Sequence, residues 1–250
     1  LLDVARAAGA HAAIANDPDA DRLGAAIPQA DGSWRRLGGD EIGWLFADYL
    51  LANTTGDDRL VVTTLVSSGL LAKMASAYGV HSAETFTGFK WIARAVLDRH
   101  ELRFIVGYEQ ALGYLVTGQP LDKDGISAAV LFAEIAAVAA ADGRTLQDWL
   151  DEIAARFGRH VLADASVRMA PADAAAKVRA LQAAPPGRIG GRAVTNIQEF
   201  PEADLLRFDL EGGVRVQIRP SGTEPKVKLY GEAVDEDPAP FVAALAALLD

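Results

Sequence analysis

The chain has 250 residues, of which 50% are hydrophobic and 23% are charged, and its net charge is −10. This is the composition of a globular protein with ample apolar material for a core, and the length allows one large domain or two ordinary ones. The negative charge argues against a nucleic-acid-binding surface. The absence of cysteine excludes disulfides, thiolate metal sites and thiol nucleophiles. No apolar run reaches the roughly 18 residues of a membrane span, so we expect no membrane association and a cytoplasmic location.

Strand and helix patterns alternate through the first part of the chain. The continuous β-branched run at 59–66 is typical of a parallel strand. Asp40 is placed to cap the helix that follows it. The alternation predicts an α/β fold with a mixed, mainly parallel sheet and helices. The expected helices are 1–9, 41–53, 67–79, 90–100, 125–142 and 145–158, and the expected strands are 11–16, 22–28, 59–66, 80–85 and 102–109.

The composition changes after residue 158, and strand patterns then dominate. A helix is expected at 172–184, followed by the breaker "PPGRIGG" at 185–191. Four strands are expected at 192–200, 205–212, 214–220 and 226–234, with a closing helix at 240–249. This part predicts a smaller α+β C-terminal domain.

The segment "DPDADR" at 17–22 places three carboxylates at alternate positions after a short strand, followed by an arginine. Such carboxylates can reach one hard cation, and Mg²⁺ accepts oxygen ligands of this kind. An EF-hand loop is excluded, because its sixth position would be Arg22 rather than glycine and its twelfth Pro28 rather than glutamate. The alternative is a solvated acidic turn, although so much charge between apolar strands needs partners.

Three further segments carry polar groups at turns. "TGFK" at 87–90 offers a glycine and a lysine at a strand-to-helix turn, or it is an ordinary turn with an exposed lysine. In "GYEQALG", Glu109 follows a strand, where it can accept hydrogen bonds from sugar hydroxyls or favour a helix start. "RPSGTEPKVKLY" at 219–230 joins two cations, Arg219 and Lys228, to two hydroxyls and backbone amides on a loop between strands. These groups suit a phosphate, and a plain hairpin turn is the alternative.

These four motifs, in this order, resemble those of the α-D-phosphohexomutase superfamily, which contains phosphoglucomutases and phosphomannomutases. The form of "GYEQALGY" and "LDKDGISAAV" is most similar to the phosphoglucomutase-2 and phosphopentomutase branch. The resemblance implies the end of domain 2 at 1–38, domain 3 at 39–160 and domain 4 at 161–250. It also implies that N-terminal mutase domains, with the phosphoserine loop S-H-N-P, are missing from this chain.

The resemblance further implies a role for each motif. Mg²⁺ would be the cofactor, and sugar phosphates of glucose, mannose or a pentose would be the substrates. Phosphoryl transfer would pass through a bisphosphate intermediate. Ala111 stands where many relatives have serine, which puts hydroxyl recognition there in doubt. The metal ligands would be Asp17, Asp19 and Asp21; Arg22 and Lys123 would lie at the reaction centre; Thr87, Gly88, Lys90 and Glu109 would contact the sugar; and Arg219, Ser221, Gly222, Thr223 and Lys228 would hold the distal phosphate.

Two other functions compete with the mutase. A non-catalytic sugar-phosphate-binding protein built from mutase domains is the main alternative, and a phosphoserine loop elsewhere in the protein would decide against it. A Mg²⁺-dependent phosphatase with Asp17 as nucleophile is disfavoured, because such an enzyme does not need the distal phosphate loop. We therefore expect a mutase-type isomerase whose isolated 250-residue chain is inactive.

Overall fold

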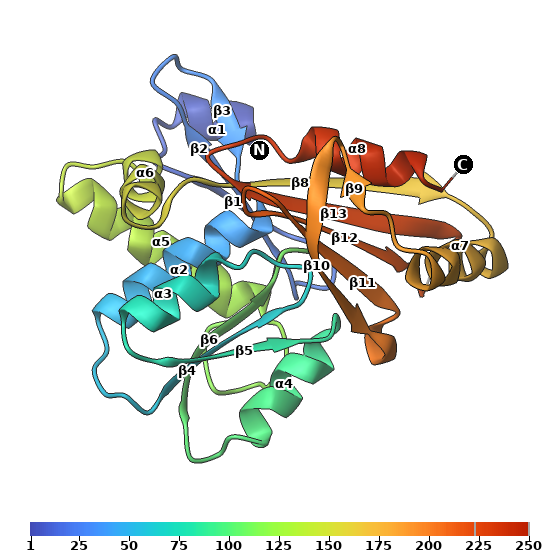
Figure 1. Cartoon of the computed structure of the whole chain (residues 1–250). Coiled ribbons are helices and arrows are strands. Elements are labelled where there is room, and N and C mark those ends of the chain that lie inside the picture. The colour runs from blue at the N-terminus through green and yellow to red at the C-terminus, as the bar shows by residue number, and fades with distance from the viewer. Residues whose placement is uncertain (223, 250) are drawn as a thin grey trace. The chain divides into compact units, whose positions relative to one another are not determined.

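The computed structural model describes residues 1–222 and 224–249, which form two units (Figure 1). The first unit comprises Leu1–Phe157 and the second Gly158–Asp250. Each unit is described by itself. The mixed α/β fold class is confirmed, while the three domain boundaries expected from the sequence remain a prediction.

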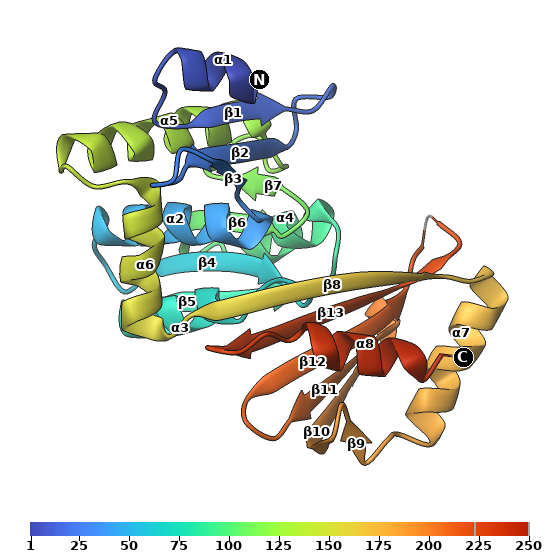
Figure 2. The same ribbon diagram turned by 90° about the horizontal axis from the view of Figure 1, so that it is seen from above.

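The first unit begins with a small antiparallel sheet. Helix α1 (Leu2–Ala7) precedes strands β1 (Ala13–Asn16), β2 (Leu23–Pro28) and β3 (Trp34–Arg36), which pair in that order. Helix α5 (Gly125–Ala141) packs against β1 and β2, as Figure 2 shows. The acidic segment 17–22 is the connection between β1 and β2, so it is held at both ends by paired strands.

A four-stranded sheet forms the rest of the first unit, in the order β5-β4-β6-β7. Strand β4 pairs in parallel with β5 and β6, whereas β7 runs antiparallel to β6. The strands are β4 (Arg59–Thr64), β5 (His81–Thr85), β6 (Arg103–Glu109) and β7 (Gly113–Leu115), and the helices are α2 (Gly39–Ala52), α3 (Leu70–Ala77), α4 (Phe89–Leu97), α5 and α6 (Leu146–Phe157). The parallel arrangement predicted from the buried run at 59–66 is confirmed. The polar turns after β4, β5 and β6 therefore share the carboxyl edge of the sheet, where α/β proteins bind ligands.

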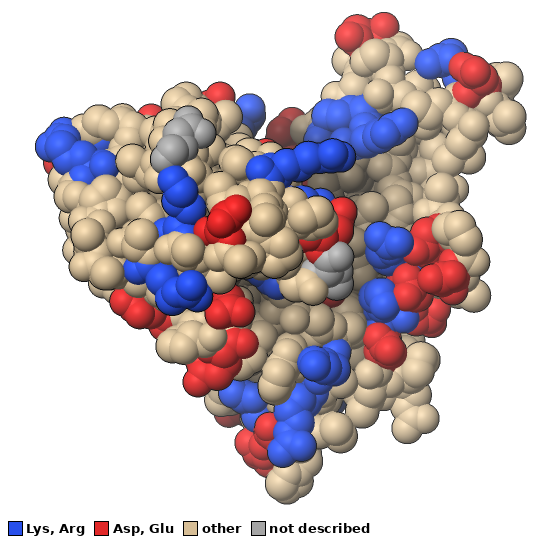
Figure 3. Space-filling view, turned by 90° about the vertical axis from the view of Figure 1, so that its right-hand side faces the viewer, with Lys and Arg blue, Asp and Glu red and all other residues tan. Residues whose placement is uncertain are grey.

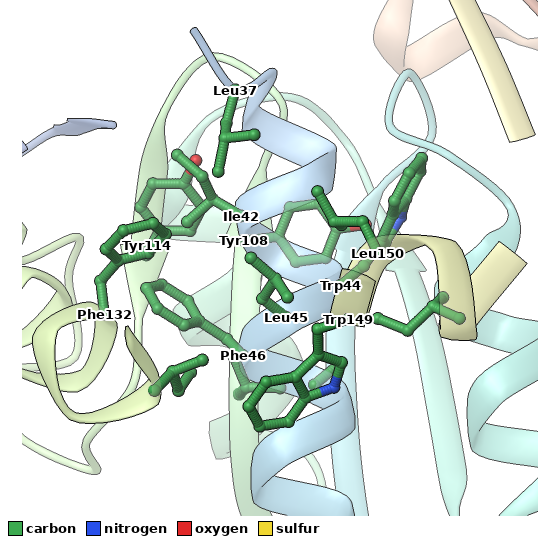
Figure 4. Packing of buried hydrophobic residues seen from close by; sticks show 14 of the residues in the cluster. Leu37, Ile42, Trp44, Leu45, Phe46, Tyr108, Tyr114, Phe132, Trp149 and Leu150 are labelled. Atoms are coloured by element: carbon green, nitrogen blue, oxygen red, sulfur yellow. The ribbon is translucent and has the colours of Figure 1, made fainter. Parts of the chain in front are cut away.

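Helix α2 lies in the centre of the main core (Figure 4). The ring of Phe46 meets Tyr114 edge-on at 5.3 Å and Phe132 at 6.4 Å between centroids. The expectation that Asp40 caps this helix is wrong. The helix begins at Gly39, two residues before the expected start at Glu41, and the Gly38 N–H is capped instead by the Glu41 carboxylate at 2.7 Å. Asp40 is buried and accepts the Ser68 N–H at 2.7 Å, so it ties α2 to the turn after β4.

The second unit is a six-stranded antiparallel sheet in the order β8-β13-β12-β11-β10-β9, with its helices packed on it. Its core is formed by one face of the sheet and the apolar sides of two helices. The strands are β8 (His160–Arg168), β9 (Arg188–Ile189), β10 (Arg192–Phe200), β11 (Leu205–Leu210), β12 (Val214–Pro220) and β13 (Lys226–Val234), and the helices are α7 (Pro171–Ala183), α8 (Ala239–Ala247) and the short 3₁₀ turn η1 (Pro201–Ala203).

The hydropathy of the helices and the charge on the surface bear on the expectations from the sequence. Among the described residues, no single helix is long and apolar enough to cross a membrane; α5 and α6 reach that length and hydropathy only jointly, across a bend of 89°. In the face shown in Figure 3, Lys and Arg groups stand beside Asp and Glu groups. Charge on that face is therefore mixed locally, although the chain as a whole is acidic.

Candidate functional site

The acidic loop 17–22 is held by backbone contacts to the start of α5. The Gly125 N–H donates to the Ala20 carbonyl at 3.1 Å, and the Asn16 side-chain amide donates to the Arg22 carbonyl at 2.8 Å. A Cβ at position 125 would lie only 2.5 Å from the Arg22 carbonyl oxygen, so glycine is required for this approach. The tight loop therefore has a defined position next to Lys123 and the helix that follows it.

Two cations neutralise carboxylates of this loop. Asp17 accepts the Arg22 backbone N–H at 3.1 Å and the Arg22 Nε–H at 2.7 Å. The Lys123 ammonium lies 2.6 Å from an Asp21 oxygen, although the two residues are far apart in the sequence. Burial pulls the pKa of Asp17 upward, but the hydrogen bonds and charge of Arg22 outweigh it and leave this pKa below its usual 3.8. The hydrogen bond to Asp21 raises the pKa of Lys123, which keeps the ammonium charged.

These side-chain positions bear on the expected metal. Three carboxylates on one short loop are hard oxygen donors, which suit Mg²⁺ in kind. Across residues 1–222 and 224–249, however, no three acidic or histidine side chains are arranged to hold an ion. Arg22 and Lys123 engage Asp17 and Asp21, whereas Asp19 is exposed. Coordination of one ion by all three carboxylates thus requires Asp17 and Asp21 to leave their ion pairs with Arg22 and Lys123.

The turn between β6 and β7 lies beside the acidic loop. Glu109 and Gly113 are paired across the hairpin, and Gly113 forms an isolated bridge with Arg22. The Leu23 N–H donates to the Leu112 carbonyl at 3.1 Å. A Cβ at position 113 would lie 3.2 Å from the Lys123 Cδ, so glycine leaves room for this lysine to reach Asp21.

Loop and hairpin enclose a pocket of about 270 Å³. Among the residues proposed from the sequence, the structure brings together five around this pocket. The lining consists of Asp19, Asp21, Arg22, Glu109, Ala111, Gly113 and Lys123. The pocket therefore combines acidic and cationic groups with the small side chain of Ala111.

The Thr87–Lys90 turn joins this group through its backbone. Gly88 has φ +116°, a conformation that other residues rarely adopt, and its N–H donates to a Glu109 carboxylate oxygen at 2.6 Å. Thr87 and Lys90 are exposed, and the Lys90 ammonium lies 5.4 Å from the centre of the Trp91 ring. The prediction of a strand-to-helix turn at this position is confirmed by β5 and α4.

The phosphate motif lies in the second unit, around the turn between β12 and β13. Arg219 and Lys228 are direct partners in the antiparallel ladder, so both side chains project from the same face. Both cations lie on the strands expected at 214–220 and 226–234, although the motif as a whole was expected on the loop between them; Ser221 and Gly222 lie in the turn. Thr223 lies outside the described residues. The Arg219 Nε is buried and has no hydrogen-bond partner in the described structure, so its N–H is an unsatisfied donor there.

The sequence patterns did not identify Gln110 and Ser67 as parts of the candidate site in the first unit. The Gln110 N–H donates to the Ser67 hydroxyl at 3.2 Å, which fixes the hairpin to the turn after β4. The segment "VSSG" contains a weak signal, because small hydroxyl residues follow a buried strand there, but by itself it indicates no more than a helix start.

Comparison with known proteins places these features in a family. Residues 38–157 match the model of phosphoglucomutase/phosphomannomutase α/β/α domain III, and residues 165–244 match that of the phosphoglucomutase/phosphomannomutase C-terminal domain. A probable phosphomannomutase of Haemophilus influenzae is 40% identical over 95% of this chain and 49% of its own length. A probable phosphoribomutase of Schizosaccharomyces pombe is 31% identical over 87% of this chain and 42% of its own length. The chain thus spans about half the length of the curated relatives it matches.

Solved structures show the same fold. The crystal structure of a putative phosphomannomutase from Thermus thermophilus superposes with a TM-score of 0.72 at 21% sequence identity. The match covers 99% of this chain and 49% of the phosphomannomutase chain. The two family models match consecutive parts of the chain and together cover most of it. The chain belongs to the phosphoglucomutase/phosphomannomutase family of the α-D-phosphohexomutase superfamily.

Proposed function

We propose that this chain carries the metal, sugar and phosphate loops of a Mg²⁺-dependent phosphosugar mutase. The reaction would be intramolecular phosphoryl transfer on hexose or pentose phosphates through a bisphosphate intermediate. The phosphoserine would come from a segment that this sequence does not contain. The observation that supports the proposal best is the single pocket that gathers the acidic loop, its two cations and Glu109.

A cation held at the acidic end of the pocket would neutralise a transferring phosphoryl group. Asp17, Asp19 and Asp21 would hold Mg²⁺, which when bound supplies the positive charge that phosphoryl transfer needs. Arg22 presents a guanidinium at the pocket, a group suited to phosphate oxygens. The Lys123 ammonium is a proton donor at Nζ and the second local positive charge.

The remaining loops would bind the rest of the substrate. Thr87, Lys90 and Glu109 offer a hydroxyl, an ammonium and a carboxylate for sugar hydroxyls. In the second unit, Arg219 and Lys228 offer a fork of N–H donors and a point charge from one sheet face, with the Ser221 hydroxyl in the adjoining turn. Such a set of donors suits the phosphate group of a sugar phosphate.

Titration of this chain with glucose 1-phosphate, mannose 1-phosphate and ribose 1-phosphate tests the binding part of the proposal. Each titration is run with and without Mg²⁺, and unphosphorylated glucose serves as the control ligand. We expect the phosphorylated sugars to bind and glucose to bind much more weakly; equal binding would contradict the proposal. A mutase assay of the full-length gene product then separates the enzyme from the non-catalytic binding protein, because only the enzyme converts these phosphates.

A further inference from the structure

The Glu109 carboxylate contacts the protein's own backbone. Its Oε1 atom accepts the Gly88 N–H at 2.6 Å, and the residue is only 8% exposed. Gly88 is the residue before the first turn of α4, and no side chain of that segment caps the helix. A residue 21 positions away thus satisfies the donor at the start of this helix.

This contact fixes a turn that needs an external support. Gly88 has φ +116° and ψ +125°, a conformation that favours glycine, and its N–H donates to Glu109 rather than to a group of the helix that begins at Phe89. An unsatisfied amide at this half-buried position would be costly, because a donor removed from water needs an acceptor. The Glu109 carboxylate oxygen supplies that acceptor, and the amide oxygen of a glutamine at this position could supply one as well.

Glu109 itself projects from a well-anchored hairpin. A Cβ at Gly39 would lie 2.0 Å from the Gln110 carbonyl oxygen, which shows how closely α2 backs this turn. A Cβ at Gly113 would lie 3.3 Å from the Phe89 ring, so the hairpin also packs directly on the first residue of α4. The carboxylate therefore connects a rigid support to the exposed turn that carries Thr87 and Lys90.

We propose that Glu109 is a positioning residue: its carboxylate, through the Gly88 N–H, sets the position of Thr87 and Lys90 for the ligand. The identity of that ligand rests on the proposed function, but the positioning contact exists without it. The role depends on an acceptor with the reach of a glutamate side chain. It does not depend on negative charge as such.

Three substitutions separate reach from charge. Glu109→Gln keeps the length and one carbonyl acceptor, Glu109→Asp keeps the charge but is one methylene shorter, and Glu109→Ala removes the acceptor. Glu101→Gln is the control, because it removes one exposed carboxylate just before β6. All variants are made in the 250-residue chain without any ligand. The readouts are hydrogen exchange of the Gly88 amide and the NMR resonance of the Trp91 indole, which lies next to Lys90.

We expect Glu109→Ala and Glu109→Asp to speed Gly88 exchange by about tenfold or more, because each takes the acceptor away from the Gly88 N–H. Glu109→Gln and Glu101→Gln should stay within about threefold of the parent, since an acceptor remains in both. The Trp91 indole resonance should move in the first pair and stay in the second.

Protection that survives in Glu109→Asp and is lost in Glu109→Gln would overturn the inference, because charge rather than reach would then be responsible. Unchanged exchange in Glu109→Ala would also overturn it. If Glu109→Ala does not fold, the Gln and Asp variants still give opposite expectations. A positive result in a chain that binds no sugar phosphate would leave the positioning role intact and reject the proposed function alone.

Discussion

Replacing Arg219 by alanine should weaken the binding of sugar phosphates and leave the binding of free sugars almost unchanged. The Arg219 side chain projects beside Lys228, and its Nε is already buried without a partner in the described structure. Much of the cost of removing this donor from water has therefore been met before a ligand arrives. A phosphate oxygen would add charge-assisted hydrogen bonds without a large new desolvation penalty.

The magnitude follows from the number of bonds that a guanidinium can make. A hydrogen bond to a charged group contributes about 1.5–3 kcal/mol, and a guanidinium can make two to one phosphate. Because such contributions are not fully additive, we expect a loss of about 2–4 kcal/mol, or roughly 30- to 1000-fold in Kd. Arg219→Lys should fall between the parent and the alanine variant, since it keeps the charge and loses the fork.

The assay is a titration of the 250-residue chain with glucose 1-phosphate and, separately, with glucose. Arg179→Ala is the control, because Arg179 is an exposed cation on α7 in the same unit and its removal changes the net charge equally. At physiological salt, screening over about 8 Å should keep the effect of this distant charge below about twofold. An equal loss for glucose and its phosphate, or an equal loss in Arg179→Ala, would refute the distal-phosphate role.

Three other predictions concern the first unit. Asp48→Ala should lower the free energy of unfolding by about 3 kcal/mol, because the buried Asp48 carboxylate accepts the Trp149 indole N–H at 2.8 Å and forms an ion pair with Arg156. Urea unfolding followed by tryptophan fluorescence measures this change, and a loss below about 1 kcal/mol would contradict the prediction. Asp124 caps α5, and its hydrogen bonds outweigh burial and lower the pKa of its carboxyl below 3.8. The free energy of unfolding of the parent should therefore exceed that of Asp124→Asn by a constant amount at neutral pH, and this difference should shrink as the pH falls through the lowered pKa. A difference that persists in acid would count against the prediction. Lys123→Met should tighten Mg²⁺ binding a few-fold in calorimetry, because the lysine competes for a carboxylate of the acidic loop, and weaker binding would argue against that competition.

Local patterns predicted the elements of the site well. The strand at 59–66 and the strand-to-helix turn at 87–90 were predicted from residues adjacent in the sequence, and the structure has a strand and such a turn at these positions. Strand β8 was not predicted, and two of its inward positions are Ala163 and Ala165, which carry little strand signal. Arg219 and Lys228 lie within the strands expected at 214–220 and 226–234, so the ladder places on strands the two cations that the motif assigned to the loop.

Contacts between distant segments could not be predicted in the same way. The Lys123–Asp21 pair and the Glu109–Gly88 hydrogen bond depend on how the hairpin and the acidic loop pack, and sequence spacing contains no information on this. The error at Asp40 has the same origin. A carboxylate near a helix start usually caps that helix, but here the turn after β4 offers a buried N–H that needs an acceptor.

The charge of the pocket gives a physical reason for these long-range pairs. Its lining sets three carboxylates against two cations, which leaves it one charge negative, and Asp17 behind it adds a further carboxylate. A pocket of this sign repels a phosphate dianion. Without a metal, Arg22 and Lys123 are the counter-ions that allow the acidic loop to fold against apolar strands. A divalent cation would reverse the balance, so the same two side chains would become available to a phosphate at the moment the pocket begins to attract one.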